Sequence, residues 1–378
     1  MTGKFRFSFG PWNIHEGADP FGPPVREPFD FSSKLAVYRK LGFEGVQFHD
    51  DDAVPELNRY SRKEALTLAR EMKKRLHDQE LVCEFVAPRL WEDPRTIDGA
   101  YTSNSPKERQ YAIDRSKLAA DIARELDCDK MVLWLAREGT YIREAKNARV
   151  MVGRIVEAIN AILDHDKKLK ILIEPKPNEP MDHAYLPTMG HAVATAYLTN
   201  DPDRVGALME TAHAILAGQD PSDEMAFALH HKKLWSVHLN DQNGLKYDQD
   251  KAFGSANLRM AFNQVRVLDE AGYGQNGEFV GLDVKVMRTQ KRADSFQHLE
   301  SSKETFLLLL EKVRTLDHKV VEQHVSERDY EGLDAYLLRH LLGATAVRRV
   351  DGKEGVVSAP GARVSSRGGA KVARRDGR

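Results

Sequence analysis

Eight short apolar runs, each separated from the next by a helix-period segment, repeat along most of this 378-residue chain. The runs are mostly continuous in hydrophobicity, which is typical of parallel strands covered on both faces. Strands that alternate with helices in this way predict an α/β fold of the (β/α)8 or TIM barrel type. The predicted strands are residues 4–10, 45–50, 81–88, 130–136, 169–176, 204–211, 234–241 and 278–285.

A doubly wound open sheet is the main alternative, but such a sheet normally carries a glycine-rich turn after its first strand. The corresponding segment, FGPWNIHEGADPFGPP, contains no GxGxxG motif. We therefore predict a barrel domain over residues 1–318. An amphipathic helix at 329–344 indicates a short C-terminal helical arm over 319–350, and the Gly-, Ser- and Arg-rich segment 351–378 predicts a disordered basic tail.

Charge and composition narrow the partners and the location. A formal net charge of −1 gives no global field that would attract nucleic acid or an anionic membrane. The sequence has no apolar run of about 18 residues and no signal-peptide core, so we expect a cytoplasmic protein that does not cross a membrane. The two cysteines form no CxxC motif and are expected to be buried structural thiols.

Acidic and imidazole side chains follow the fifth to the eighth predicted strands, where a TIM barrel places its functional groups. Converging carboxylates at the mouth of an apolar barrel stay ionised only if cations lie among them. An oxygen-rich set with some imidazole suits Mg²⁺, Mn²⁺ or Co²⁺, and the charge of five carboxylates favours two divalent ions over one. The candidate ligands are Glu174, Glu210, His213, His238, Asp248, Asp250 and Asp283.

Several segments carry a resemblance to the xylose (glucose) isomerases. They are FHDDD, EPKPNEP, the Glu-x-x-His of ETAH, LNDQNGLKYDQD and LDVK, with DPFG at 19–22 and REG at 137–139 in support. The match covers roughly residues 5 to 310, in the same order and at the same strand positions. It implies an aldose–ketose isomerase with two divalent ions, which converts D-xylose to D-xylulose and extends to D-glucose and D-fructose.

The resemblance also implies two sets of metal ligands that share one glutamate. The first set is Glu174, Glu210, His238 and Asp283, and the second is Glu210, His213, Asp248 and Asp250. In this family a water on the second ion takes the O2 proton while hydride moves between C2 and C1.

Roles for other side chains follow from the same resemblance. Lys176 would stabilise charge on O1, and His49, oriented by Asp52, would open the cyclic sugar by proton transfer. Trp12 and Trp134 would line the substrate pocket, with Phe21 reaching into that of a neighbouring subunit. Two further pocket residues are predicted from the sequence itself: Trp91 in the third-strand loop, and Lys285, which follows Asp283 by two positions.

Two positions depart from the family pattern. His238 stands where xylose isomerases have an aspartate and is closer to the pattern of rhamnose isomerases and ketose 3-epimerases. This imidazole predicts a preference for Mn²⁺ or Co²⁺ over Mg²⁺. Arg89 and Trp91 replace smaller polar and phenylalanine side chains, which leaves a sugar with an acid group or another stereochemistry as an alternative substrate.

Other functions stay open on the sequence. One alternative is a related isomerase or epimerase that acts on another sugar, such as L-rhamnose. The others are a metal-dependent phosphodiester nuclease, which would need a basic DNA-facing surface, and a non-catalytic sugar-binding barrel. The resemblance implies a homotetramer, and the shortened C-terminal arm leaves a dimer as the alternative.

Overall fold

Parallel strands close into a barrel in the computed structural model, which describes residues 5–19, 21–350 and 353–358. Among these residues, eight strands follow the order β1-β10-β9-β8-β6-β4-β3-β2. The barrel closes where β1 pairs with β10, with Arg6 opposite Phe279 and Phe9 opposite Leu282. The predicted TIM barrel is therefore confirmed, and the open-sheet alternative is wrong. The strands are β1 (Arg6–Phe9), β2 (Gly45–His49), β3 (Val82–Ala87), β4 (Lys130–Trp134), β6 (Lys170–Glu174), β8 (Val205–Glu210), β9 (Leu234–Leu239) and β10 (Phe279–Leu282).

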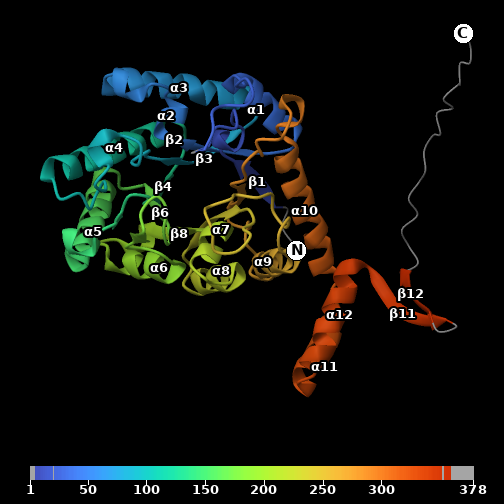
Figure 1. Cartoon of the computed structure of the whole chain (residues 1–378). Helices are drawn as coiled ribbons and strands as arrows, with labels where there is room; N and C mark the ends of the chain where they lie inside the picture. Colours follow the sequence, from blue (N-terminus) through green and yellow to red (C-terminus); the bar gives the residue numbers. More distant parts are fainter. Residues whose placement is uncertain (1–4, 20, 351–352, 359–378) are drawn as a thin grey trace, which may run out of the picture. The chain divides into compact units, whose positions relative to one another are not determined.

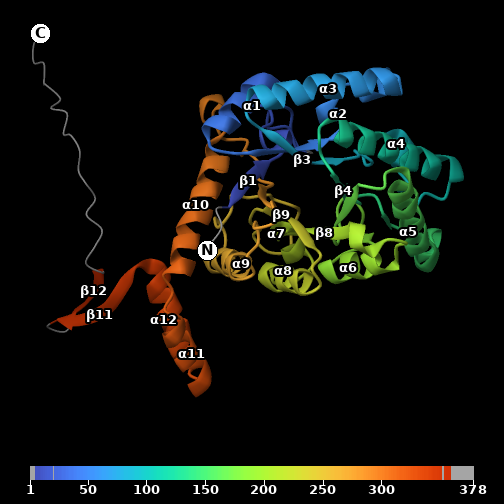
Figure 2. The ribbon, with the colours of Figure 1, turned by 180° about the vertical axis from the view of Figure 1, so that it is seen from behind.

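Helices between the strands surround the barrel (Figures 1 and 2). Several begin at a capping side chain: Ser61 Oγ accepts from the backbone N–H of Glu64 and so satisfies a donor that the helix leaves open. None of the described helices is long and apolar enough to span a membrane. The helices of this part are α1 (Phe31–Lys40), α2 (Asp50–Ala53), α3 (Arg62–Asp78), α4 (Pro106–Glu125), α5 (Ala148–His165), α6 (Met189–Leu198), α7 (Thr211–Leu216), α8 (Pro221–His230), α9 (Leu258–Glu270) and α10 (Gln297–Arg314).

Short elements complete this part of the chain. A small antiparallel sheet pairs β5 (Gly139–Thr140) with β7 (His183–Ala184), in the loops that follow β4 and β6. The 3₁₀ turns are η1 (Pro11–Asn13), η2 (Leu57–Arg59), η3 (Pro94–Thr96), η4 (Arg143–Ala145), η5 (Pro202–Arg204) and η6 (Arg292–Asp294). The loops after the strands therefore have structure of their own and can hold side chains in place.

Aromatic rings fill the space between β1 and α10. Phe306 meets Phe5 and Phe7 edge-on, with ring centroids 5.1 and 5.3 Å apart, and all three rings are buried. Edge-on pairs of this kind stabilise a core beyond the area that they bury. Cys83 and Cys128 are free and buried, as the sequence predicts.

The C-terminal residues form a second compact unit that begins at Glu311, slightly before the predicted boundary at 318. It holds α11 (His318–Glu327), which begins one residue before the predicted helical arm, and α12 (Tyr330–Leu342), which lies within it. Two predictions are wrong here, because residues 344–350 are a strand and residues 353–358 are not disordered. They form an antiparallel hairpin, β11 (Ala344–Val350) with β12 (Lys353–Ser358). The sequence holds the signal, an Asp-Gly pair between two valine-containing runs; residues 359–378 lie outside the described part.

We expect the protein to lose stability in mild acid because of His298 on α10. Its Nε2 donates to the Asn13 carbonyl at 2.8 Å. Burial, with the charges of His15 and Arg26, lowers the pKa of His298 from 6.5 to about 4. Between these values the unfolded chain binds a proton that the folded chain does not, so stability falls as the pH drops from 6.5 toward 4. The loss amounts to about 3 kcal/mol.

Denaturant unfolding between pH 4 and 7 measures this loss. His298→Gln, whose amide can still donate to Asn13, should flatten the profile in this range. The exposed His77 on α3 provides the control, because His77→Gln should leave the profile unchanged. Parallel profiles for wild type and His298→Gln would contradict the assignment.

Candidate active site

The seven predicted metal ligands come together at the carboxyl ends of the strands. Glu174 and Glu210 end β6 and β8, His238 lies near the end of β9, and Asp283 directly follows β10. His213 comes from α7, and the loop after β9 supplies Asp248 and Asp250. In the described part of the chain, their ligand atoms form three overlapping groups, each with all atoms within 4.8 Å of one another. These groups are Glu174–Glu210–His213, Glu210–His238–Asp283 and Glu210–Asp248–Asp250.

His238 faces three carboxylates at almost equal distances. Its Nδ1 lies 3.7 Å from Glu174 Oε1, 3.6 Å from Glu210 Oε2 and 3.7 Å from Asp283 Oδ2. This buried nitrogen has no hydrogen-bond partner among the described residues. Ligand atoms about 2.1 Å from one ion, at roughly tetrahedral angles, lie about 3.4 to 3.6 Å from each other. The spacing therefore fits a cation held by His238, Glu210 and Asp283, which form one ligand group. Glu174 Oε1 lies near both imidazoles, 3.7 Å from His238 Nδ1 and 3.6 Å from His213 Nδ1.

His213 occupies a similar position on the other side of Glu210. Its Nε2 lies 3.3 Å from Glu210 Oε1 and 3.2 Å from Asp248 Oδ2. Neither His213 Nδ1 nor Asp248 Oδ1 has a hydrogen-bond partner within the described part of the protein. Asn240 Nδ2 donates to both Glu210 Oε1, at 2.9 Å, and Asp250 Oδ1, at 3.1 Å. The Asn240 amide thus holds Glu210 and Asp250 beside each other. The buried atoms His213 Nδ1 and Asp248 Oδ1 stay free of hydrogen bonds from the described residues and could bind a cation.

The carboxylates differ in how well nearby positive charge compensates them. Burial raises the pKa of Glu210 to about 7, and burial together with the charge of Asp248 raises that of Asp250 well above its usual value. Burial has the same tendency at Glu174, but His238 and His213 outweigh it and lower the pKa to about 2. A divalent ion would stabilise the ionised form of all of them.

Two lysines already pair with candidate ligands. Lys176 Nζ lies 2.8 Å from Asp248 Oδ2 and 3.2 Å from Glu179 Oε2, and Lys285 Nζ forms an ion pair with Asp250. Both lysines lie beside the cluster of candidate ligands. Five carboxylates and two lysines carry a net charge of about −3, so one divalent ion brings the cluster to about −1 and two bring it to about +1. The number of ions therefore depends on ligand geometry rather than on net charge.

His49 and Asp52 form the predicted pair, and the local helix explains why. His49 ends β2 and precedes α2, where Asp52 Oδ2 accepts from the His49 backbone N–H at 3.1 Å and approaches its Nδ1 at 2.7 Å. Acidic residues in a first helical turn are favoured by the helix dipole. Arg89 Nη2 also lies 2.8 Å from this Nδ1. Asp52 can only accept and a guanidinium can only donate, so we assign an Nδ1–H that donates to Asp52, and the approach of Arg89 is then a contact between two donors and not a hydrogen bond.

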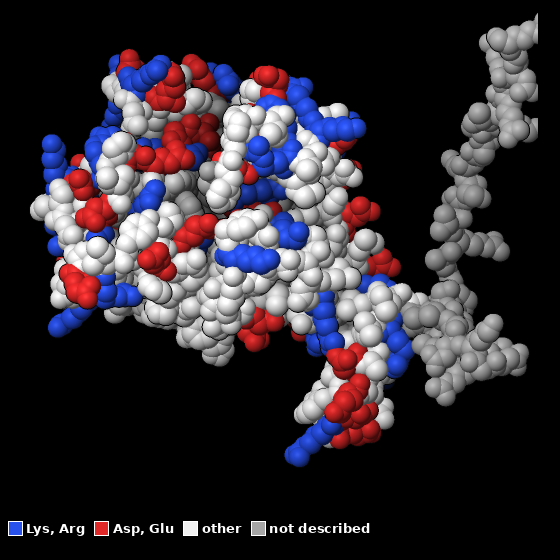
Figure 3. Space-filling model, viewed as in Figure 1, with Lys and Arg blue, Asp and Glu red and all other residues white. Residues whose placement is uncertain are grey.

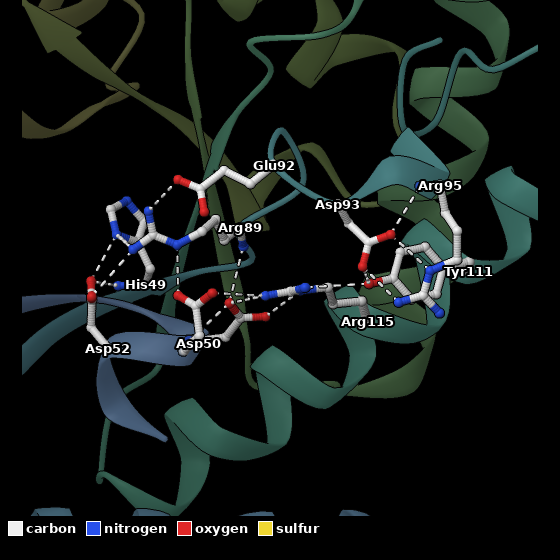
Figure 4. Close-up of polar contacts among 10 residues, drawn as sticks. His49, Asp50, Asp52, Arg89, Glu92, Asp93, Arg95, Tyr111 and Arg115 are labelled. Carbon is white, nitrogen blue, oxygen red and sulfur yellow. Dashed lines mark hydrogen bonds and ion pairs between the residues drawn. The ribbon is translucent and has the colours of Figure 1, made fainter. Parts of the chain in front are cut away.

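Arg89 is neutralised by acids of this chain (Figure 4). Its guanidinium meets Asp51 Oδ1 at 2.7 Å, Asp52 Oδ1 at 3.2 Å and Glu92 Oε1 at 3.2 Å. Three carboxylates around one guanidinium leave no net positive charge to attract an acidic substrate. The geometry therefore speaks against the alternative of a sugar with an acid group.

Aromatic side chains form one wall beside His49. The His49 ring lies 4.3 Å from Trp12 and 5.1 Å from Trp91, and Trp91 lies 4.5 Å from Trp134, measured between ring centroids. Trp12 has a second role, because its Nε1 donates to Asp283 Oδ1 at 2.9 Å. Phe21 is 94% exposed and does not join this wall; its insertion into a neighbouring subunit stays a prediction.

The sequence analysis missed some residues near the site because it considered mainly the ends of the strands. Arg115 on α4 binds Asp50 through two hydrogen bonds of 2.8 and 2.9 Å. Gln47 and Glu84 are both buried; Gln47 contacts His238 and also donates to Glu84. The available signal was a polar residue in the middle of an apolar strand, which a barrel interior accepts only when it is hydrogen-bonded.

Comparisons with known proteins identify the family and the fold. Residues 35–301 match the family model described as the xylose isomerase-like TIM barrel. The chain is 34% identical over 314 residues to the xylose isomerase of Thermus thermophilus, a match that covers 82% of this chain and 80% of that one.

Solved structures share the fold at low sequence identity. D-psicose 3-epimerase from Clostridium cellulolyticum H10 superposes with a TM-score of 0.58 at 12% identity, over 81% of this chain and 99% of that one. The 3-keto-D-glucoside 4-epimerase of E. coli also gives 0.58 at 12% identity, over 80% and 99%. From the family match and the Thermus relative, we conclude that the chain belongs to the xylose isomerase-like TIM barrel family.

Proposed function

We propose that this protein is a metal-dependent aldose–ketose isomerase that acts on a free sugar, with D-xylose and D-xylulose as the first pair to test. The proposal depends on one observation above all, the buried cluster of five carboxylates and two imidazoles organised around Glu210. The family and its relatives support the coarser class, a sugar isomerase or epimerase. The 34% identity to a xylose isomerase supports the finer assignment.

Two divalent ions that share Glu210 suit this cluster best. We assign His238, Glu174 and Asp283 to the first ion and His213, Asp248 and Asp250 to the second. Three buried polar atoms of the cluster have no hydrogen-bond partner among the described residues, which supports a bound cation. They are His213 Nδ1, His238 Nδ1 and Asp248 Oδ1. When bound, such ions polarise sugar oxygens and lower the pKa of a coordinated water.

The chain's own side chains would handle the protons. With Nδ1–H held by Asp52, His49 keeps a basic Nε2 that can pass a proton between the ring oxygen and the anomeric hydroxyl. The isomerisation then moves a hydride between C2 and C1 and a proton from O2 to O1, so that atoms and charge balance. Lys176, drawn to the cluster by Asp248, would stabilise negative charge on O1. The wall formed by Trp12, Trp91 and Trp134 would exclude water.

The alternatives predict different surroundings. An epimerase with one metal between two catalytic carboxylates has no use for the group of Asp248, Asp250 and His213 beside Glu210. A nuclease would be expected to present a basic surface. Figure 3 instead shows a hollowed face on which acidic and basic side chains are interspersed. A non-catalytic sugar-binding barrel would not require the His49–Asp52 pair.

Metal removal and replacement test the proposal. The chelator-stripped protein should not convert xylose to xylulose, and added metal should restore turnover. Because His238 offers nitrogen where a carboxylate would favour Mg²⁺, we expect Mn²⁺ or Co²⁺ to restore more activity than Mg²⁺. Higher activity with Mg²⁺ would refute this ion preference. Metal binding without turnover on xylose or glucose would exclude these substrates and direct the search to other sugars.

A further inference from the structure

A buried amide lies on the side of His238 away from the carboxylates. His238 Nε2 is 3.1 Å from Gln47 Oε1, and both side chains are almost fully buried. The amide nitrogen of Gln47 donates to Ser8 Oγ and Glu84 Oε2, each at 3.1 Å. An amide oxygen only accepts hydrogen bonds, so the hydrogen between the two residues belongs to His238 Nε2.

Glu84 determines which end of the Gln47 amide faces His238. If the amide were turned over, its oxygen would lie against the Glu84 carboxylate, which already accepts from Ser236 Oγ at 2.7 Å and from Ser8. Two acceptors in contact in a dry interior lose a hydrogen bond and repel each other. The carboxylate therefore selects the orientation in which the Gln47 oxygen faces the imidazole.

Gly281 on β10 leaves the space in which the imidazole and the amide meet. A Cβ at this position would lie 2.4 Å from Gln47 Nε2, 2.5 Å from the Val237 carbonyl oxygen and 3.1 Å from His238 Cδ2. Side chains in a close-packed interior cannot absorb such overlaps without moving. The contact between Gln47 and His238 thus depends on the missing side chain of a third strand.

We infer that Gln47 is a positioning residue that holds His238 as the Nε2–H tautomer and turns the lone pair of Nδ1 toward the carboxylate cluster. This inference rests on the proposed metal centre. A metal-bound histidine usually donates its other N–H to a fixed acceptor, and loss of such an acceptor weakens metal binding by about 10- to 100-fold. Gln47 supplies that acceptor as a neutral group, so it adds no negative charge to an already acidic cluster.

Titration of Mn²⁺ into the metal-stripped protein, followed by calorimetry, tests this role. Gln47→Met keeps the length of the side chain but removes the acceptor, and should weaken one binding event by about 10- to 100-fold. Gln47→Glu should restore most of the affinity, because a protonated carboxyl can donate to Glu84 and accept from His238. The control is Ser236→Ala, which removes a hydrogen bond to the same Glu84 but leaves the Gln47–His238 contact intact. This variant should bind Mn²⁺ like the wild type.

Nitrogen-15 NMR of histidine-labelled, Zn²⁺-loaded wild type reads the tautomer directly and needs no variant. The expected result is a protonated Nε2 and a metal-bound Nδ1 for His238. Wild-type protein that binds no metal would overturn the proposed metal centre itself. Wild-type binding with the metal on Nε2, or with unchanged affinity in a folded Gln47→Met variant, would overturn only the role of Gln47.

Discussion

Glu210→Gln is expected to empty the whole metal cluster at once and to lower turnover at least about a thousandfold, or about 4 kcal/mol of transition-state stabilisation. Glu210 is the one side chain that belongs to all three ligand groups in the described part of the chain. Glutamine has nearly the same shape, but it lacks the charge and has only one oxygen. A ligand that served a single ion would affect only one of two binding events.

A nearby acid offers the matched control for this variant. Glu179 contacts Lys176 at 3.2 Å but belongs to none of the ligand groups found among the described residues. Glu179→Gln should therefore keep both binding events in a Mn²⁺ titration. Two binding events of wild-type affinity in Glu210→Gln would show that this residue is not the shared ligand.

Although Glu210→Gln should lose metal binding and turnover, it should make the metal-free protein more stable at pH 7. Burial raises the pKa of Glu210 from 4.5 to about 7. Between these values the folded protein holds a proton that the unfolded chain releases, so the stability of the wild type falls as the pH rises. Without metal, Glu210→Gln should therefore be more stable than wild type at pH 7, while added Mn²⁺ should stabilise the wild type more than the variant.

Arg115→Met is expected to lower the free energy of unfolding by about 3 to 5 kcal/mol, the usual result when one partner of a buried ion pair is lost. Arg115 and Asp50 are both buried and joined by two hydrogen bonds (Figure 4). Asp50 also accepts the backbone N–H groups of Asp51, at 3.0 Å, and Arg89, at 3.1 Å. The substitution would leave this carboxylate charged and without its main cation, and would disturb the turn that carries His49.

Denaturant unfolding of a double variant separates the ion pair from general packing. Arg115→Met with Asp50→Asn removes both charges and should recover part of the loss. Arg70 and Glu125 form an exposed pair of similar geometry, and Arg70→Met should change stability little. If Arg115→Met lowered the free energy of unfolding no more than Arg70→Met does, the buried ion pair would stabilise the fold no more than the exposed one.

The strands and the convergence of the candidate ligands could be predicted because both leave local marks in the sequence. Glu174 follows an apolar run directly, and a (β/α)8 pattern places all such strand ends on one face. The partners of these ligands leave no such mark. Gln47 and His238 are 191 positions apart and come from strands that are not neighbours, so their contact exists only after the barrel closes. The neutralisation of Arg89 likewise depends on the loop that follows β3.

The hydrogen bond from Trp12 to Asp283 crosses the seam of the barrel, where the first strand meets the last. Each partner follows one of the two seam strands by a few residues at most. A cation bound at Asp283 would therefore stabilise the pairing of β1 with β10. Because it binds only when this seam is closed, it would make opening of the seam less frequent. Metal binding at the carboxyl ends of the strands should therefore slow hydrogen exchange at Phe7 and Val280 within them.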